Sequence, residues 1–165
     1  MTSGDLARVL QWRNHPEVRR FMYTSHVITP KEHASWFERN SGAPGVWLLI
    51  YEVAGVPMGF VNISSTRCPQ VADWGFYLAP DSEPGTGHAL GMATLSYAFE
   101  ELGLHKLCGQ ALGFNERSIR FHERLGFIRE GVLREQHYDG EHYQDVVCFG
   151  LLAAEWKTRN RGIRA

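Results

Sequence analysis

Residues 74–127 have the sequence WGFYLAPDSEPGTGHALGMATLSYAFEELGLHKLCGQALGFNERSIRFHERLGF, from which the fold can be predicted most directly. The first residues, Trp74–Ala79, are rich in aromatic side chains and stop at Pro80, which is typical of a strand. A glycine-rich turn follows and opens a helical pattern that lasts to about Leu102. This order indicates an anion-binding loop, because the first helical N–H groups have no partner within the helix. An ordinary turn is the alternative, since most Gly-x-Gly pairs are only that.

The second half of the stretch predicts another strand and another helix. The range Lys106–Leu112 has strand character, and Asn115 can cap a short helix that Gly126 ends. Asn115, then Ser118 or Ile119, and then His122 follow the period of that helix and therefore share one face. An amide, a hydroxyl and an imidazole are thus expected side by side.

With both motifs in view, the chain resembles the GCN5-related N-acetyltransferases (GNAT), which use acetyl-CoA. Ser82–Gly87 fills the six places of the family's pyrophosphate loop, and residues 115–127 resemble its Asn-helix-Gly-Phe signature. The resemblance implies that loop amides hold the pyrophosphate and that backbone of the preceding strand pairs with pantetheine. The cofactor-binding residues implied in this way are Phe76, Tyr77, Leu78, Gly85, Thr86, Gly87, His88, Ala89, Asn115 and Ser118.

The expected fold is α/β, with a mixed, mostly antiparallel twisted sheet and helices on both faces. The resemblance implies that Val71–Ala79 and Lys106–Leu112 form a parallel pair that splays apart. At 165 residues, the chain is expected to form a single domain, 1–165. Other expected elements are helical pieces within residues 6–39, with a cap at Thr29-Pro30, and strands at Val46–Val53, Met58–Ser64, Ile128–Tyr138 and His142–Leu152. The tail from Lys157 is expected to be frayed and solvated.

Composition limits the classes of partner and compartment. The formal net charge of −1 gives no global attraction to nucleic acid or to an anionic membrane. No apolar run approaches the roughly 20 residues that a membrane span needs. The three scattered cysteines favour a reduced, cytoplasmic protein, and no ligand spacing for a metal is present. A homodimer remains an open possibility.

Acyl transfer from a thioester to an amine needs a general acid and a general base. His122 stands where the family usually has a tyrosine acid, and imidazole can donate a proton near neutral pH. The alternative is a core histidine, because Phe121 and Leu125 suggest a buried stripe. Asp73, just before the Trp74 strand, is a candidate base if desolvation raises its pKa. A solvated aspartate is the alternative for that position, and the rival bases are His15, His26 and His33.

The N-terminal region carries many donors beside aromatic side chains, which suits a substrate with a diphosphate and a flat base. Its sequence from Trp12 resembles the sugar-nucleotide branch of the family. In that branch a UDP-linked 4-amino-4,6-dideoxy sugar is acetylated on the pathway to pseudaminic acid, which decorates bacterial flagella. The resemblance implies a substrate pocket lined by Arg13, Met22, His26, His33 and Asn62.

Other acceptors and another class of protein stay open. Protein N-termini, polyamines and aminoglycosides are alternative acceptors. Gln110 stands where ribosomal-protein acetyltransferases carry a glutamate base, which counts against a close match with them. A non-catalytic acyl-CoA sensor is the alternative of a different class, and His122 in place of tyrosine favours it.

Overall fold

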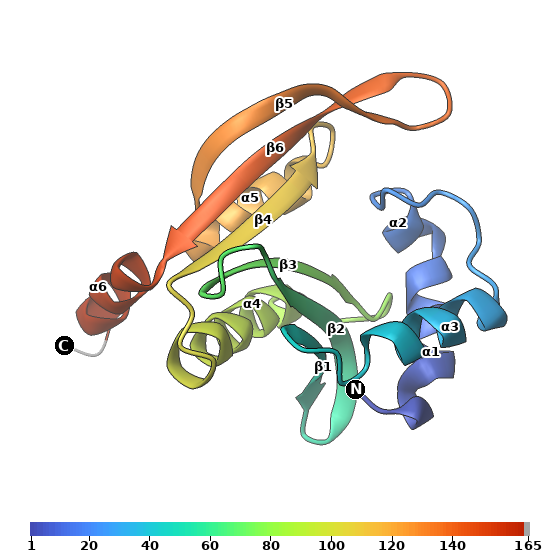
Figure 1. Ribbon diagram of the computed structural model, residues 1–165, viewed down its shortest axis with the longest axis horizontal. Coiled ribbons are helices and arrows are strands. Elements are labelled where there is room, and N and C mark those ends of the chain that lie inside the picture. Colours follow the sequence, from blue (N-terminus) through green and yellow to red (C-terminus); the bar gives the residue numbers. More distant parts are fainter. Residues whose placement is uncertain (164–165) are drawn as a thin grey trace. The chain divides into compact units, whose positions relative to one another are not determined.

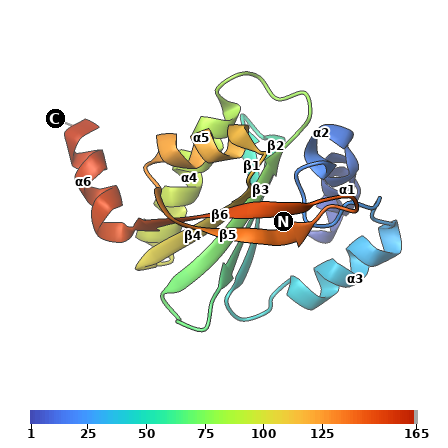
Figure 2. The same ribbon diagram turned by 90° about the horizontal axis from the view of Figure 1, so that it is seen from above.

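The computed structural model describes residues 1–163, with side chains up to residue 159. The chain is a mixed α/β structure in which six strands follow the order β1-β2-β3-β4-β6-β5 (Figures 1 and 2). Two compact units can be distinguished, one of residues 1–64 with 75–87 and one of residues 65–74 with 88 onward. Strand β3 (Val71–Leu78) contributes to both units. The α/β prediction is confirmed, whereas the single domain stays a prediction.

The first unit places three helices with an antiparallel hairpin. Its elements are α1 (Leu6–Asn14), α2 (Pro16–Arg19), α3 (Pro30–Asn40), β1 (Val46–Val53), β2 (Val56–Ser65) and the second half of β3. The β1–β2 turn contains Ala54 and Gly55 with φ of +50° and +78°, as a two-residue hairpin turn requires. The predicted hairpin is therefore confirmed.

Capping and burial fix the helices of this unit. The Thr29 hydroxyl accepts the Glu32 N–H, and the Glu32 carboxylate accepts the Thr29 N–H, so the expected cap at Thr29-Pro30 is a full capping box. Val9 and Trp12 of α1 pack with Phe60 of β2 in a core whose members are at most 7% exposed. This contact holds α1 against the hairpin, because the buried apolar surface is lost if the helix moves away.

The second unit begins with the start of β3 and continues from the glycine-rich turn. Its elements are α4 (Thr86–Ser96), the π-helical turn Tyr97–Glu101, β4 (Lys106–Leu112), α5 (Glu116–Leu125), β5 (Ile128–Tyr138), β6 (Tyr143–Leu152) and α6 (Ala153–Ile163). Strand β4 pairs parallel with β3 over Val71–Asp73 and antiparallel with β6 along its full length. The expected parallel pair is therefore confirmed, and its splay beyond Asp73 stays a prediction.

The C-terminal tail differs from the sequence-based expectation. Residues 153–163 form helix α6, in which Trp156 is only 4% exposed and packs on Phe99 with ring centroids 6.2 Å apart. Packing of this one buried tryptophan can hold the helix in place. Nothing in the composition of the tail indicates that Phe99 is the partner of Trp156. The tail is therefore helical and not frayed from Lys157, although residues 157–159 are exposed as expected, and Arg164 lies outside the described residues.

Candidate active site

A cavity of about 610 Å³ lies within the first unit, between α1, α3, the loop that joins α2 to α3, and β3. It is lined by Arg13, Thr24, His26, Ile28, Lys31, Glu32, His33, Ser35, Trp36, Arg39 and Tyr77. Three of the five residues predicted to bind substrate line it, namely Arg13, His26 and His33. Met22 and Asn62 are not among the lining residues, and their role stays a prediction. Lys31, Arg39 and the Tyr77 side chain also line the cavity, and no sequence pattern predicted that they would.

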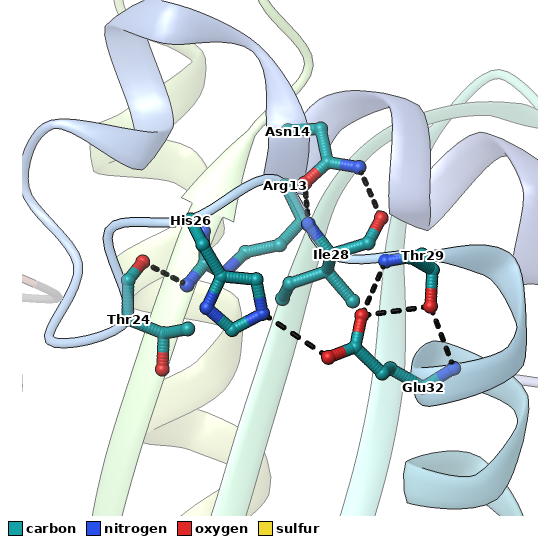
Figure 3. A network of polar contacts seen from close by, with 7 residues as sticks. All are labelled: Arg13, Asn14, Thr24, His26, Ile28, Thr29 and Glu32. Atoms are coloured by element: carbon teal, nitrogen blue, oxygen red, sulfur yellow. Dashed lines mark hydrogen bonds and ion pairs between the residues drawn. The ribbon is translucent and has the colours of Figure 1, made fainter.

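The loop that forms one wall of the cavity is held by side chains of α1 and α3 (Figure 3). The Asn14 amide both accepts the Ile28 N–H, at 2.9 Å, and donates to the Ile28 carbonyl, at 2.8 Å. The Asn14 side chain thereby satisfies both backbone hydrogen-bonding groups of Ile28, as a neighbouring strand would in a sheet. His26 Nε2 lies 3.2 Å from the Glu32 carboxylate, which ties the same loop to α3.

Arg13 places a partly unsatisfied cation in the cavity wall. Its Nη2 donates to the Thr24 carbonyl at 3.1 Å, while Nη1 is buried and has no hydrogen-bond partner within the described residues. Burial is the largest cause that lowers the pKa of Arg13, and the charge of Arg19 adds to it, while Tyr77 opposes the shift. A guanidinium nevertheless stays protonated in proteins. A buried donor without a partner is costly, so this group favours an anionic or carbonyl-bearing ligand.

Aromatic side chains form the other part of the wall. His33 is only 5% exposed and stacks on Trp36, with ring centroids 5.2 Å apart and an interplanar angle of 17°. Tyr77 packs on Phe60 at 5.2 Å, and burial raises the pKa of its hydroxyl so that it stays protonated. Flat apolar surface beside a cation suits a ligand with a ring and a negative charge.

The buried His33 imidazole leads to a prediction about stability and pH. Burial, followed by the charge of Arg13, lowers the pKa of His33 below its ordinary 6.5. The unfolded chain then binds this proton more readily, so the free energy of unfolding should fall as pH drops below 6.5. Above that pH the contribution is constant. Urea unfolding of His33→Gln and wild type between pH 7.5 and 5 tests this, and identical pH slopes would contradict it.

The glycine-rich turn has the backbone that a pyrophosphate loop needs. Gly85 has φ of +95°, and a side chain there would meet nothing within 4 Å, so the backbone is open to a ligand. Helix α4 begins directly after it at Thr86, so the N–H groups of Gly87, His88 and Ala89 belong to a helix N-terminus. The loop therefore fits an anion, as the sequence analysis expects. Phe76 and Leu78, on the strand that leads to this loop, are half-buried.

Asn115 and Ser118 form the N-cap of α5. The Asn115 side-chain oxygen accepts the Ser118 N–H at 3.1 Å, and Gly126 ends the helix with φ of +98°. Both boundaries of this helix were predicted. Because the cap uses the side-chain oxygen of Asn115, the NH₂ group of the same side chain is the part suited to a ligand. Binding of the cofactor by Asn115 and Ser118 stays a prediction.

His122 lies in the core of the second unit. It is 1% exposed and stacks on Phe149 with ring centroids 4.8 Å apart. Its Nδ1 lies 2.8 Å from the Ser118 carbonyl, and because a carbonyl can only accept, Nδ1 carries the proton. Burial lowers the pKa of His122, which keeps the ring neutral near pH 7. A buried neutral imidazole is a weaker acid than an imidazolium, so this position favours the core alternative, and the catalytic role stays a prediction.

Comparison with known proteins gives the family. A model of the acetyltransferase (GNAT) domain matches residues 1–128. The chain belongs to this family. GNAT members use acetyl-CoA, so the expectations of an acetyltransferase and of this co-substrate agree with the family.

Individual relatives of this GNAT chain differ in coverage. The chain is 26% identical to the acetyltransferase PseH of Campylobacter jejuni, in a match that covers 77% of this chain and 79% of PseH. It is 36% identical to the prophage-derived uncharacterized N-acetyltransferase YokL of Bacillus subtilis, but the match spans only 51% of this chain and 49% of YokL. A spermidine N-acetyltransferase of Vibrio cholerae, solved with CoA and spermine, superposes with a TM-score of 0.87 at 20% identity over 95% of both chains. That likeness shows the GNAT fold.

Asp73 occupies a half-desolvated place on β3 of the GNAT sheet. It pairs in register with Cys108 of β4, and although its side chain is exposed, the adjacent strands remove part of its water. This desolvation raises the pKa of Asp73, and burial likewise raises the pKa of Cys108. A raised pKa suits a general base, but its role stays a prediction. Of the rival bases, His26 and His33 line the cavity, whereas His15 accepts the Glu17 N–H as a helix cap.

Two further observations concern metals and membranes. In the part of the chain that the structure describes, no group of three or more His, Cys, Asp or Glu side chains could hold a metal ion. None of the helices within residues 1–163 combines the length and apolar character that crossing a bilayer requires.

Proposed function

We propose that this protein transfers the acetyl group of acetyl-CoA to the primary amine of a sugar nucleotide in the cytoplasm. The acceptor that we favour is a UDP-linked 4-amino-4,6-dideoxy sugar, as in the pathway to pseudaminic acid. The observation that carries this proposal is the buried Nη1 of Arg13, which has no partner within the described residues. Arg13 lines the same cavity as the stacked rings of His33 and Trp36. Similarity to PseH over most of the chain supports the same acceptor class.

The size of the cavity agrees with such an acceptor. Its volume of about 610 Å³ lies within the roughly 300–1,000 Å³ that is common for small-molecule sites. A guanidinium can bind two phosphate oxygens at once, and an indole can stack with a flat base. We therefore assign Arg13 to the diphosphate and Trp36 to the base.

In this proposal the chain's own groups position the reactants and move one proton. The amides that begin α4 hold the pyrophosphate of acetyl-CoA, which supplies the acetyl group as a thioester. The amine loses one proton as the amide C–N bond forms and the C–S bond breaks, and the departing sulfur leaves as a thiolate that takes up a proton from water. His33, neutral because burial lowers its pKa, can accept that proton directly or through water. His26, at the same cavity, is the alternative acceptor.

The experiment is an acceptor panel with a competition arm. Release of free CoA is followed with a disulfide reagent in the presence of the UDP-linked amino sugar, spermidine, an N-terminal peptide and an aminoglycoside. We expect turnover to be fastest with the UDP-linked sugar. UDP should compete with that sugar and not with acetyl-CoA. Tight acetyl-CoA binding without turnover on any amine would instead favour the non-catalytic sensor.

A further inference from the structure

Helix α3 presents a row of polar and basic side chains to the cavity. Lys31, Ser35 and Arg39 lie four residues apart, so they follow one another along a single face of the helix. All three line the cavity, with Lys31 and Arg39 exposed and Ser35 half-buried. The two cations therefore stand where a ligand in the cavity meets solvent. We call these three residues the α3 row.

The charges of the α3 row are not neutralised by neighbours. Within residues 1–159, neither Lys31 nor Arg39 forms an ion pair, although cations elsewhere pair with carboxylates, as Lys106 does with Glu130 at 2.6 Å. Among the described residues, the only carboxylate that lines the cavity is that of Glu32. It already accepts the N–H and O–H of Thr29, both at 2.7 Å, and faces His26.

The cavity is therefore locally positive in a protein whose formal net charge is −1. Its lining carries three positive side chains, Arg13, Lys31 and Arg39, and one negative side chain, Glu32. The net charge of the lining is therefore +2 when the histidines are counted as neutral. Low-dielectric walls concentrate such a field, which attracts anionic ligands and repels cationic ones. A polyamine would bring several positive charges into this field.

We infer that Lys31 and Arg39 are the specificity residues that set the sign of the acceptor's charge, favouring anionic acceptors and excluding polyamines. This inference deepens the proposed function and rests on it. Because the two side chains stand at the cavity mouth, they act on capture of the acceptor more than on the chemical step. Their effect should therefore appear mainly in KM and should weaken as salt screens the field.

The test compares a charge-reversed variant, Lys31→Glu/Arg39→Glu, with wild type. Initial rates are measured with the UDP-linked amino sugar, the same sugar without its nucleotide, and spermidine, at low and high salt. We expect kcat/KM for the UDP-linked sugar to fall about 100-fold, chiefly through KM, and its salt dependence to be lost. The sugar without nucleotide should lose far less, and spermidine should gain about tenfold.

A matched control reverses two exposed cations outside the cavity, Arg67→Glu/Lys157→Glu, and should leave the preference among the three acceptors as in wild type. Equal losses for all acceptors in the α3 variant, or the same shift in the control, would overturn the inference. A different result would contradict the proposed function itself, namely that wild type releases CoA with none of the amines. Wild type that turns over all three acceptors equally well leaves acetyl transfer intact and overturns the assigned charge selectivity.

Discussion

Replacing Gly85 by valine is expected to weaken acetyl-CoA binding about 100-fold, which corresponds to about 2.7 kcal/mol. Gly85 has φ of +95°, a conformation that a β-branched residue adopts only with strain of about 1–3 kcal/mol. Relief of that strain would turn the loop amides away from the positions that suit an anion. The added methyl groups would also occupy the open space in front of the backbone. Titration calorimetry with acetyl-CoA measures the change.

A second glycine provides the control for backbone strain alone. Gly55, in the β1–β2 turn, has φ of +78° and likewise nothing within 4 Å of a built side chain. Gly55→Val should lower the melting temperature to a similar extent while leaving acetyl-CoA binding near that of wild type. If both variants lost binding equally, general destabilisation would explain the result and the loop would not be the pyrophosphate site.

The features that could be predicted from sequence are those encoded by neighbouring residues. Thr29 and Asn115 cap helices through side-chain bonds to the N–H groups of residues three positions later. Gly126 and the Ala54-Gly55 turn need left-handed backbone, which leaves a sequence signature. The strands at Val46–Val53 and Lys106–Leu112 match their predicted bounds. The first is apolar at every position except Glu52, so its strand character can be read from neighbouring residues.

The features that were missed depend on contacts between distant residues. Asn14 supports the loop at Ile28, fourteen residues away, and nothing near Asn14 in the sequence indicates that partner. Helix α6 is held by Trp156 against Phe99 in the same way. The cationic character of the cavity also needs the fold, because it depends on Lys31 and Arg39 being unpaired, which the sequence cannot show.

His122 illustrates how a family signature and the packing can favour different roles. The signature places this residue where an acid is expected, whereas the structure surrounds it with Trp74, Phe127 and Phe149. The Ser118 carbonyl fixes the proton on Nδ1, so Nε2 is the acceptor nitrogen. Nε2 fills the space that a side chain at Gly109 would need, since a Cβ built there would lie 2.5 Å from it. Gly109 therefore offers a direct test of the packing role.

Gly109→Ala is expected to destabilise the protein by about 2–3 kcal/mol, an unusually large cost for one methyl group. The new Cβ would lie 2.5 Å from His122 Nε2 and 2.8 Å from Trp74 Nε1, and both side chains are at most 7% exposed. Neither ring can rotate into solvent, so the strand or the aromatic cluster must shift. Urea unfolding measures the cost, with Gly131→Ala as control, because a side chain at Gly131 meets nothing within 4 Å. Equal costs for the two variants would contradict the packing.

Adding His122→Ala to Gly109→Ala separates the core role of His122 from a catalytic one. The smaller side chain makes room for the new methyl group, so the double variant should lose less stability than the sum of the two single changes. If His122 serves packing, acetyl transfer by the folded double variant should stay within about tenfold of wild type, and the pH profile of kcat should be unchanged. If His122 is instead the general acid, kcat of the folded double variant should fall about 10²–10⁴-fold, and one limb of its pH profile should disappear. The stability measurement reports on the aromatic cluster and the pH profile reports on the proton, so the two roles predict different pairs of results.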